Sequence, residues 1–116
     1  MKENALPCVD FEHFLKLDVR IGTVLHAVLN EKARVPSYVL QIDFGPLGVK
    51  SSSAQLTERY PPDDLVGRQV VAVVNFPAKR VAGVKSEVLV LAAVDEAVGT
   101  TLLAVTHPVA DGTRIA

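Results

Sequence analysis

The chain has 116 residues, a hydrophobic share of 49% and a formal net charge of −1, which together predict one soluble globular domain. No apolar run reaches the roughly 18 residues that a membrane span needs. The amino terminus lacks the apolar stretch of a signal peptide, so we expect a cytoplasmic protein. The single cysteine, Cys8, excludes an internal disulfide, and the near-zero net charge requires any nucleic-acid site to be a local basic patch.

The predicted elements begin with a short helix near the amino terminus. Phe11, Phe14 and Leu15 recur at helical spacing, and Asp10 stands where it can cap that turn. Residues 18–28 then alternate between apolar and polar side chains, which predicts a strand with one buried face. The periodicity of the chain therefore changes from that of a helix to that of a strand.

Short strands account for most of the remaining chain. Apolar segments predict strands over residues 38–44, 47–53, 69–75 and 87–94, and weaker strands over 102–105 and 113–115. Gly22, inside the first strand, predicts a bulge or bend, and residues 61–67 predict a one-turn helix that starts with prolines. Five main strands with a short helix before the fourth match an all-β fold, the five-stranded OB-fold barrel.

The sequence contains no catalytic or metal-binding pattern. His13, His26 and His107 are not at metal-ligand spacing from one another, and Cys8 has no partner at such spacing. Residues 83–86 end like a phosphate-binding loop but lack its upstream glycine, and no Gly-x-Ser-x-Gly elbow is present. A Ser-His-Asp catalytic triad remains an open alternative, because its residues need to be close only in space and not in sequence. We therefore expect a binding protein and not an enzyme.

The segment from residue 75 to residue 91 carries the strongest functional signal, because it reads as strand, basic loop, strand. The polar residues of this loop and its ends are Asn75, Lys79, Arg80, Lys85 and Ser86. Lysine and arginine on such a loop can contact phosphates, while asparagine and serine can bind a base edge or a peptide group. Composition alone favours a solvated connection, because three charges on a loop are ordinary.

Four other residues are candidates for the same site. Arg34 lies in the first long loop, where OB-folds bind ligands, and there a ligand contact and a plain connection are equally supported. Phe44 and Phe76 are candidate stacking platforms, although we expect at least one of them to pack in the core. Ser53 is more consistent with satisfying local backbone groups than with binding a ligand.

Two motifs resemble those of the stand-alone tRNA-binding OB-fold family. Residues 18–22 resemble the family's first-strand motif. The family's later motif combines an asparagine, basic residues, a glycine, a serine and an apolar strand, and here it is matched by Asn75, Lys79, Gly83, Ser86 and Leu91. Within the family the chain most resembles the CsaA-like export-related chaperones. The stretches that carry this are 33–36, 42–45, 50–57 and 75–91, and the resemblance covers nearly all of residues 11–115.

The resemblance implies a five-stranded barrel over residues 16–94, with terminal extensions, 1–15 and 95–116, that form a homodimer. It implies no cofactor and no reaction. It also implies a binding groove near Ser53, Asn75, Lys79 and Ser86, which raises the ligand-binding expectation for Ser53. The complete set of residues expected to bind a peptide or tRNA is Arg34, Ser53, Asn75, Phe76, Lys79, Arg80, Lys85 and Ser86.

Two functions remain open. The first is a dimeric chaperone for unfolded, export-destined polypeptides, with preproteins and the secretion motor as candidate partners. The second is a structure-specific tRNA-binding protein. Glu87 stands where tRNA-binding members often have alanine, and a negative charge beside the loop opposes phosphate, so it favours the chaperone. Ser51 stands where CsaA-like chains usually have glutamine.

Overall fold

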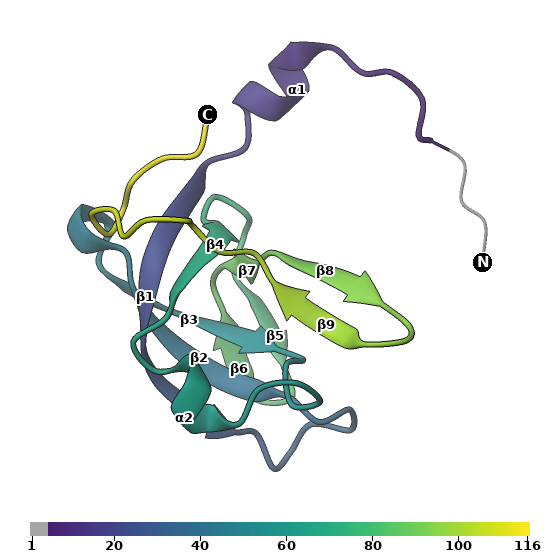
Figure 1. The fold of residues 1–116 in the computed structure, drawn as a ribbon, viewed down its shortest axis with the longest axis vertical. Helices are drawn as coiled ribbons and strands as arrows, with labels where there is room; N and C mark the ends of the chain where they lie inside the picture. The colour runs from purple at the N-terminus through teal and green to yellow at the C-terminus, as the bar shows by residue number, and fades with distance from the viewer. Residues whose placement is uncertain (1–4) are drawn as a thin grey trace.

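A computed structural model gives the fold of residues 5–116 (Figure 1). Its elements in chain order are α1 (Phe11–Leu15), β1 (Val19–Leu29), β2 (Tyr38–Asp43), the 3₁₀ turn η1 (Gly45–Leu47), β3 (Val49–Ala54), α2 (Pro62–Leu65), β4 (Gln69–Val73), β5 (Lys79–Val81), β6 (Val84–Ser86), β7 (Leu89–Val90), β8 (Ala92–Asp95) and β9 (Gly99–Leu102). The predicted all-β class is therefore confirmed. Among the described residues, no helix has both the length and the apolar composition to cross a membrane.

The main sheet has five antiparallel strands in the order β3-β2-β1-β4-β7 and curls into a nearly closed barrel. This arrangement confirms the predicted OB-fold. The sheet ends in β3 on one side and β7 on the other, and the barrel closes where the Glu87 N–H donates to the Ser51 carbonyl over 2.9 Å. Two hairpins, β5–β6 and β8–β9, extend from this barrel.

Strand β1 is long because it serves two neighbours. Residues 19–23 pair with β4, and residues 23–29 pair with β2. The sequence predicted a bulge or bend at Gly22, but the pairing register shifts later in the strand, between Val24 and His26. Gly22 has a packing role instead. A β-carbon there would lie 2.7 Å from the Phe44 ring, so glycine makes room for that ring.

Two apolar clusters hold the fold together. The barrel interior contains the larger cluster, in which Leu40, Ile42 and Phe44 are fully buried at 0% exposure. The smaller cluster lies on the other face of β1 and β4 and consists of Val19, Ile21, Val71 and Val73, with Leu17, Leu91, Val105 and Ile115 packed against it. The carboxyl-terminal segment therefore covers a face of the sheet.

The last residues of the chain form an edge contact and not the predicted strand over 113–115. The Ile21 N–H donates to the Thr113 carbonyl over 2.9 Å, and the Ile115 N–H donates to the Val19 carbonyl over 2.8 Å. They pair with β1 where β2 does not reach. The prediction over 87–94 was also too coarse, because β7 stays beside β4 and β8 turns away into a hairpin with β9.

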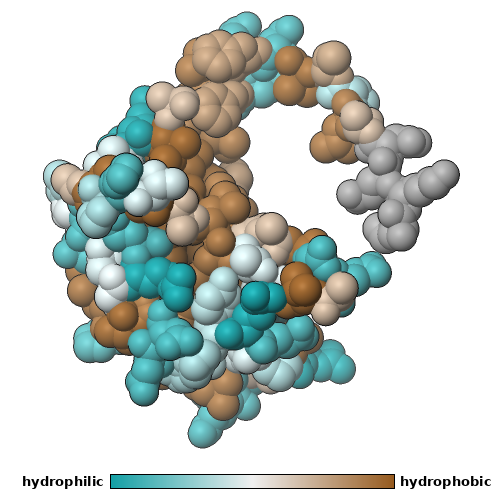
Figure 2. All heavy atoms as spheres, viewed as in Figure 1, coloured by the Kyte–Doolittle hydropathy of each residue, from teal (hydrophilic) through white to brown (hydrophobic). Residues whose placement is uncertain are grey.

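Helix α1 stands away from the barrel on an amino-terminal arm (Figure 1). The helix forms as predicted, but the Asp10 side chain does not cap it; the Asp10 carbonyl accepts the His13 N–H instead, over 3.0 Å. Phe11 is 71% exposed and Leu15 is 52% exposed, and no residue of α1 is buried. Figure 2 shows apolar side chains gathered on this arm.

Candidate ligand-binding site

The expected basic loop is a two-stranded hairpin. β5 and β6 pair through Lys79 with Ser86, Arg80 with Lys85, and Val81 with Val84. Ala82 and Gly83 form the turn with φ of 48° and 83°, the left-handed conformation that a tight hairpin needs at both central positions. An alanine there is unusual, because a β-carbon costs about 1–2 kcal/mol in this conformation.

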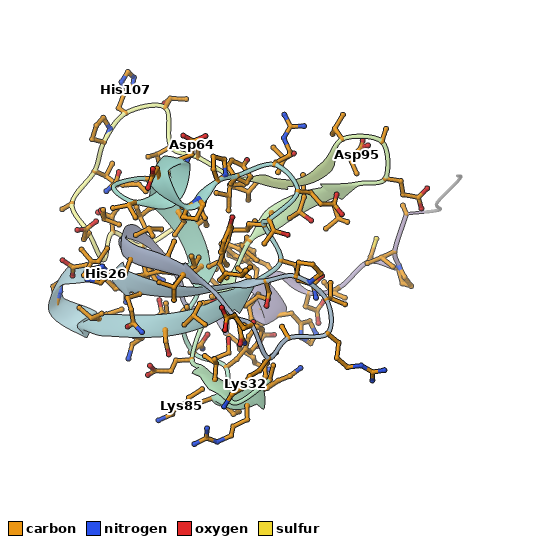
Figure 3. All side chains as sticks on the ribbon, turned by 90° about the horizontal axis from the view of Figure 1, so that it is seen from below. His26, Lys32, Asp64, Lys85, Asp95 and His107 are labelled. Carbon is orange, nitrogen blue, oxygen red and sulfur yellow. The ribbon has the colours of Figure 1, made fainter. Side chains whose placement is uncertain are left out.

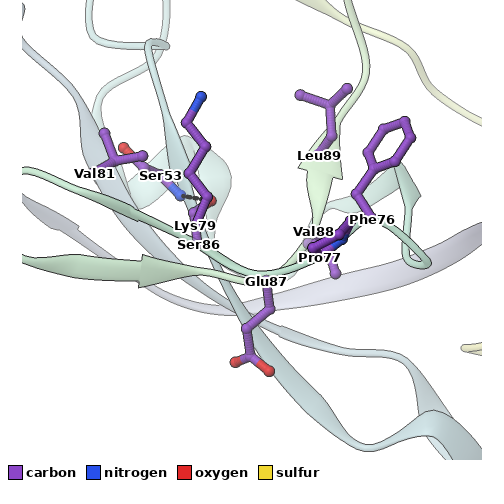
Figure 4. Close-up of a pocket in the computed structure, with 9 residues that line it drawn as sticks. All are labelled: Ser53, Phe76, Pro77, Lys79, Val81, Ser86, Glu87, Val88 and Leu89. Atoms are coloured by element: carbon purple, nitrogen blue, oxygen red, sulfur yellow. Dashed lines mark hydrogen bonds between the residues drawn. The ribbon is translucent and has the colours of Figure 1, made fainter.

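Strand alternation gives the hairpin two faces of different chemistry. Lys79 and Ser86 face an open pocket of about 390 Å³ (Figure 4). Arg80 and Lys85, one position along each strand, lie on the opposite face. The pocket is lined by Ser53, Phe76, Pro77, Lys79, Val81, Ser86, Glu87, Val88 and Leu89. Four of the predicted ligand-binding residues therefore meet in one pocket: Ser53, Phe76, Lys79 and Ser86.

Ser53 lies where this pocket meets two neighbouring hollows. A hollow of about 400 Å³ adjoins it along the end of β3, and another of about 380 Å³ adjoins it toward Arg34. Ser53 lines all three, and its N–H donates to Ser86 Oγ over 3.1 Å (Figure 4). This bond is made by the Ser53 backbone and the Ser86 side chain, so it does not test the expectation that the Ser53 side chain satisfies local backbone groups.

Glu87 does not present its charge to the pocket. Its carboxylate points to the side away from Lys79 (Figure 4), where Glu87 Oε1 accepts the Ser51 N–H over 3.2 Å and lies 3.1 Å from Ser51 Oγ. The backbone hydrogen bond from Ser51, then its hydroxyl, and then the charges of Lys50 and Lys85 lower the pKa of Glu87 below its ordinary value. Glu87 therefore places its negative charge outside the pocket, near Lys50 and Lys85, and it is on that outer side that it opposes phosphate.

Glu87→Gln is expected to lower the free energy of unfolding at neutral pH by less than about 1 kcal/mol, because the carboxylate is only partly buried. Since the folded pKa is lowered, the stabilising contribution is complete above the ordinary value of 4.5 and disappears as pH falls through the folded pKa. Urea unfolding of both proteins at pH 7 and pH 3 measures this difference. Glu31→Gln, at an exposed position, is the control, and a gap that persists at pH 3 would contradict the prediction.

The remaining predicted residues lie around the pocket and not in it. Asn75 is a structural tie: its Oδ1 accepts the Asp18 N–H over 2.8 Å, and its Nδ2 donates to the Lys16 carbonyl over 2.8 Å. Arg34 lines the hollow of about 380 Å³, and the Arg80 guanidinium donates to the Gly83 carbonyl over 3.1 Å.

The two phenylalanines separate clearly. Phe44 is fully buried at 0% exposure, so it belongs to the core, as expected for at least one of the pair. Phe76 is 46% exposed and lines the pocket. Only Phe76 is therefore available to a ligand.

Sequence reasoning missed two kinds of site residue. Pro77, Val88 and Leu89 line the pocket, although their apolar character pointed only to strands and turns. Lys32 and Lys50 join the cations of the hairpin through folding, and Figure 3 shows Lys32 and Lys85 at one end of the molecule. We call the whole group the basic end: Lys32, Arg34, Lys50, Lys79, Arg80 and Lys85, six of the 12 lysines and arginines of the chain.

The loop before β2 is held against the hairpin tip. Asn30 Nδ2 donates to the Ala82 carbonyl over 3.4 Å, and this contact brings Lys32 and Arg34 toward the hairpin. Over residues 5–116, no cluster of three or more histidine, cysteine, aspartate or glutamate side chains is arranged to hold a metal ion. The chemistry that the site offers is apolar contact, hydrogen bonding and positive charge.

Comparisons with known proteins show the family and the fold. The family model described as a putative tRNA binding domain matches residues 19–114. The crystal structure of the chaperone CsaA from Bacillus anthracis superposes with a TM-score of 0.90 and 58% sequence identity, over 95% of this chain and 100% of that one. CsaA from Picrophilus torridus gives 0.88 and 39%, over 94% and 100%.

Curated relatives with similar sequences are much longer proteins. The methionine–tRNA ligase of Porphyromonas gingivalis is 35% identical over 109 residues, which are 92% of this chain and 15% of that enzyme. The methionine–tRNA ligase of Methanococcoides burtonii is 37% identical over 95 residues, 82% of this chain and 14% of that enzyme. The chain therefore spans about one seventh of the length of these relatives.

Proposed function

The chain belongs to the putative tRNA-binding domain family, and we propose that within it the protein acts as a CsaA-like chaperone that binds unfolded, export-destined polypeptides. The observation that carries this proposal is the pocket beneath the β5–β6 hairpin. Phe76 and Leu89 offer apolar surface there, and Lys79 and Ser86 offer hydrogen bonds. An extended polypeptide needs both kinds of contact, and the likeness to two CsaA structures supports the choice.

The proposed clients are on their way to export, and no reaction is assigned to the chain. Preproteins in the cytoplasm are the proposed ligands, and the secretion motor is the proposed next partner. The ligase relatives match over only 15% and 14% of their length, so the proposal does not carry their catalytic activity over to this chain. The chain's part is to hold a ligand.

We also propose a homodimer built by the amino-terminal arm. Phe11 and Phe14 stack with ring centroids 6.0 Å apart, and both stay exposed on a helix that buries nothing. Light scattering is expected to give a dimer mass at micromolar concentration, and Phe11→Ser with Phe14→Ser is expected to give a monomer. Val94→Ser, at a position 83% exposed on the β8–β9 hairpin, is the control. A monomer mass for the unaltered protein would reject the proposal.

The basic end supports a second candidate, a tRNA-binding protein. Half of the lysines and arginines gather there, and the family description and the ligase relatives name tRNA. Phosphate contacts release counterions, so such binding weakens steeply as salt rises. Apolar and hydrogen-bonded peptide binding changes much less with salt.

Titrating fluorescent tRNA and an unfolded fluorescent preprotein at two salt concentrations tests both candidates. We expect salt-tolerant preprotein binding that weakens at least about tenfold in Phe76→Ser, because an exposed aromatic in a pocket is a typical binding hot spot. Val98→Ser, at a position 52% exposed outside the pocket, is the control. Binding of tRNA alone would replace the chaperone proposal with the second candidate, and binding of neither ligand would reject both.

A further inference from the structure

The barrel has an open seam between the two edge strands of its main sheet. β3 and β7 end the strand order and do not pair with each other. At Ser51 the seam is bridged by the Glu87 N–H, but at Ser53 the partner is only a side chain, Ser86 Oγ. Beyond Ser53, toward the end of β3, the hollow of about 400 Å³ opens between the two strands.

The hollow is bordered by the end of β3 with the two residues after it, and by β7 with the start of β8. One wall is residues 53–56 and the other is residues 89–92, four consecutive residues on each side, with Val94 and Thr100 nearby. A hollow on the face of a sheet would be lined by alternate residues, because successive side chains point to opposite faces. Consecutive residues on both sides mean that the main chain itself borders the hollow.

The direction of the backbone groups agrees with this. The N–H groups of Ser51 and Ser53 both point away from β2 and into the seam. Gln55, just beyond the end of β3, lines the hollow at the centre of a tight turn in which the Leu56 N–H donates to the Ala54 carbonyl over 3.1 Å. On the other wall the Leu91 N–H donates to the Val71 carbonyl of β4. Strand alternation therefore turns the backbone N–H and carbonyl of Val90 away from β4 and toward the seam. Unpaired strand edges of this kind are templates for another chain.

The chemistry of the hollow selects the class of ligand. Its lining contains no charged residue, and Leu56, Leu89 and Leu91 give it apolar sides. A phosphate backbone requires cations, which lie at the basic end and not here. An extended polypeptide offers what the seam lacks: main-chain donors and acceptors for the two edges, and apolar side chains for the walls.

We infer that an extended polypeptide binds in this seam as an added strand, hydrogen-bonded through its main chain to the edges of β3 and β7. The inference rests on the proposed chaperone function and gives it a binding mode. Main-chain hydrogen bonds are independent of sequence, so this mode suits a protein that must accept many unfolded clients. The ligand then continues from Ser53 into the pocket beneath the hairpin, where Phe76 lies.

The test uses the full-length protein and a fluorescein-labelled ten-residue peptide that alternates valine and serine. Replacing one central amide by an ester removes a single N–H donor and keeps the side chains, and it is expected to weaken binding roughly 2- to 10-fold. Three central esters are expected to weaken it more than about tenfold. An ester at the terminal residue, outside the seam, is the matched control peptide.

A protein variant tests the same contact from the other side. Gln55→Pro and Gln55→Ala both remove the side chain, but only proline removes the N–H, so we expect Gln55→Pro to bind the peptide roughly 2- to 10-fold more weakly than Gln55→Ala. Circular dichroism checks that both variants fold, and the ester series stands on the unaltered protein if the proline variant does not.

The outcomes separate this inference from the proposed function. If the parent peptide binds and the esters bind equally well, strand addition is wrong, while the chaperone proposal stands. If neither the parent peptide nor the unfolded preprotein binds, the proposed function itself fails. If Gln55→Pro abolishes self-association by light scattering and leaves peptide binding intact, the seam holds a second copy of the chain and the inference is overturned.

Discussion

Replacing Phe44 with alanine is expected to lower the free energy of unfolding by about 3–5 kcal/mol, the usual cost of truncating a buried phenylalanine. Phe44 is 0% exposed and belongs to the barrel core. Its ring lies against Gly22, where a β-carbon would stand 2.7 Å away, so the site is tightly packed and the truncation leaves a cavity. Because whole domains are stable by only about 5–15 kcal/mol, the variant should be marginally folded at 37 °C.

Guanidinium unfolding followed by circular dichroism measures this loss. Val49→Ala, at a position 53% exposed on β3, is the control and should change the unfolding free energy by no more than about 0.5 kcal/mol. The alternative in which Phe44 is a stacking platform makes the opposite prediction. A stable Phe44→Ala protein that has lost ligand binding would therefore contradict the core assignment.

Strand alternation made most of the barrel predictable from sequence. β2 carries alternating apolar side chains because one of its faces packs into the barrel interior, and Val19 and Ile21 alternate at the start of β1 because they pack in the smaller cluster on the other face; a pattern of period two records both. The β5–β6 hairpin was not predictable in this way. Its strands are only three residues long, and its turn places Ala82 in a conformation that alanine rarely adopts, so Gly83 was the one local mark of the turn.

The site was predictable in part for a similar reason. Lys79 and Ser86 were found because a linear motif contains them, and they do share a pocket. Asn75 belongs to the same motif, yet its amide ties the end of β4 to the start of β1, a role that only the folded chain reveals. The sequence gives the charge of a side chain but not the direction in which the side chain points. Glu87 is the example, because its carboxylate turns to Ser51.

The two faces of the hairpin allow the two candidate ligands to be separated. Lys79 faces the pocket, whereas Arg80 and Lys85 lie on the other face. Lys50, near the start of β3, adds a third positive charge near Glu87, because it and Lys85 both lower the pKa of that carboxylate. A phosphate backbone following this outer face would contact three cations without entering the pocket.

Removing these three charges, with Lys50→Gln, Arg80→Gln and Lys85→Gln together, is therefore expected to weaken tRNA binding at least about tenfold at 0.1 M salt. The slope of log K against log salt should fall by about 2–3, since each phosphate contact contributes roughly one unit. Binding of the unfolded preprotein should change by less than about twofold, because the pocket keeps its apolar residues and Lys79. Fluorescence titrations across a salt series measure both quantities.

The matched control removes three charges elsewhere, by Lys16→Gln, Arg59→Gln and Arg114→Gln, all exposed positions outside the basic end. If tRNA binding depended only on net charge, the control would weaken it as much as the outer-face variant does. If the outer-face variant instead weakened preprotein binding by the same factor as tRNA binding, the two ligands would share one surface. The separation of the hairpin into an apolar pocket face and a basic outer face would then be wrong as an account of function.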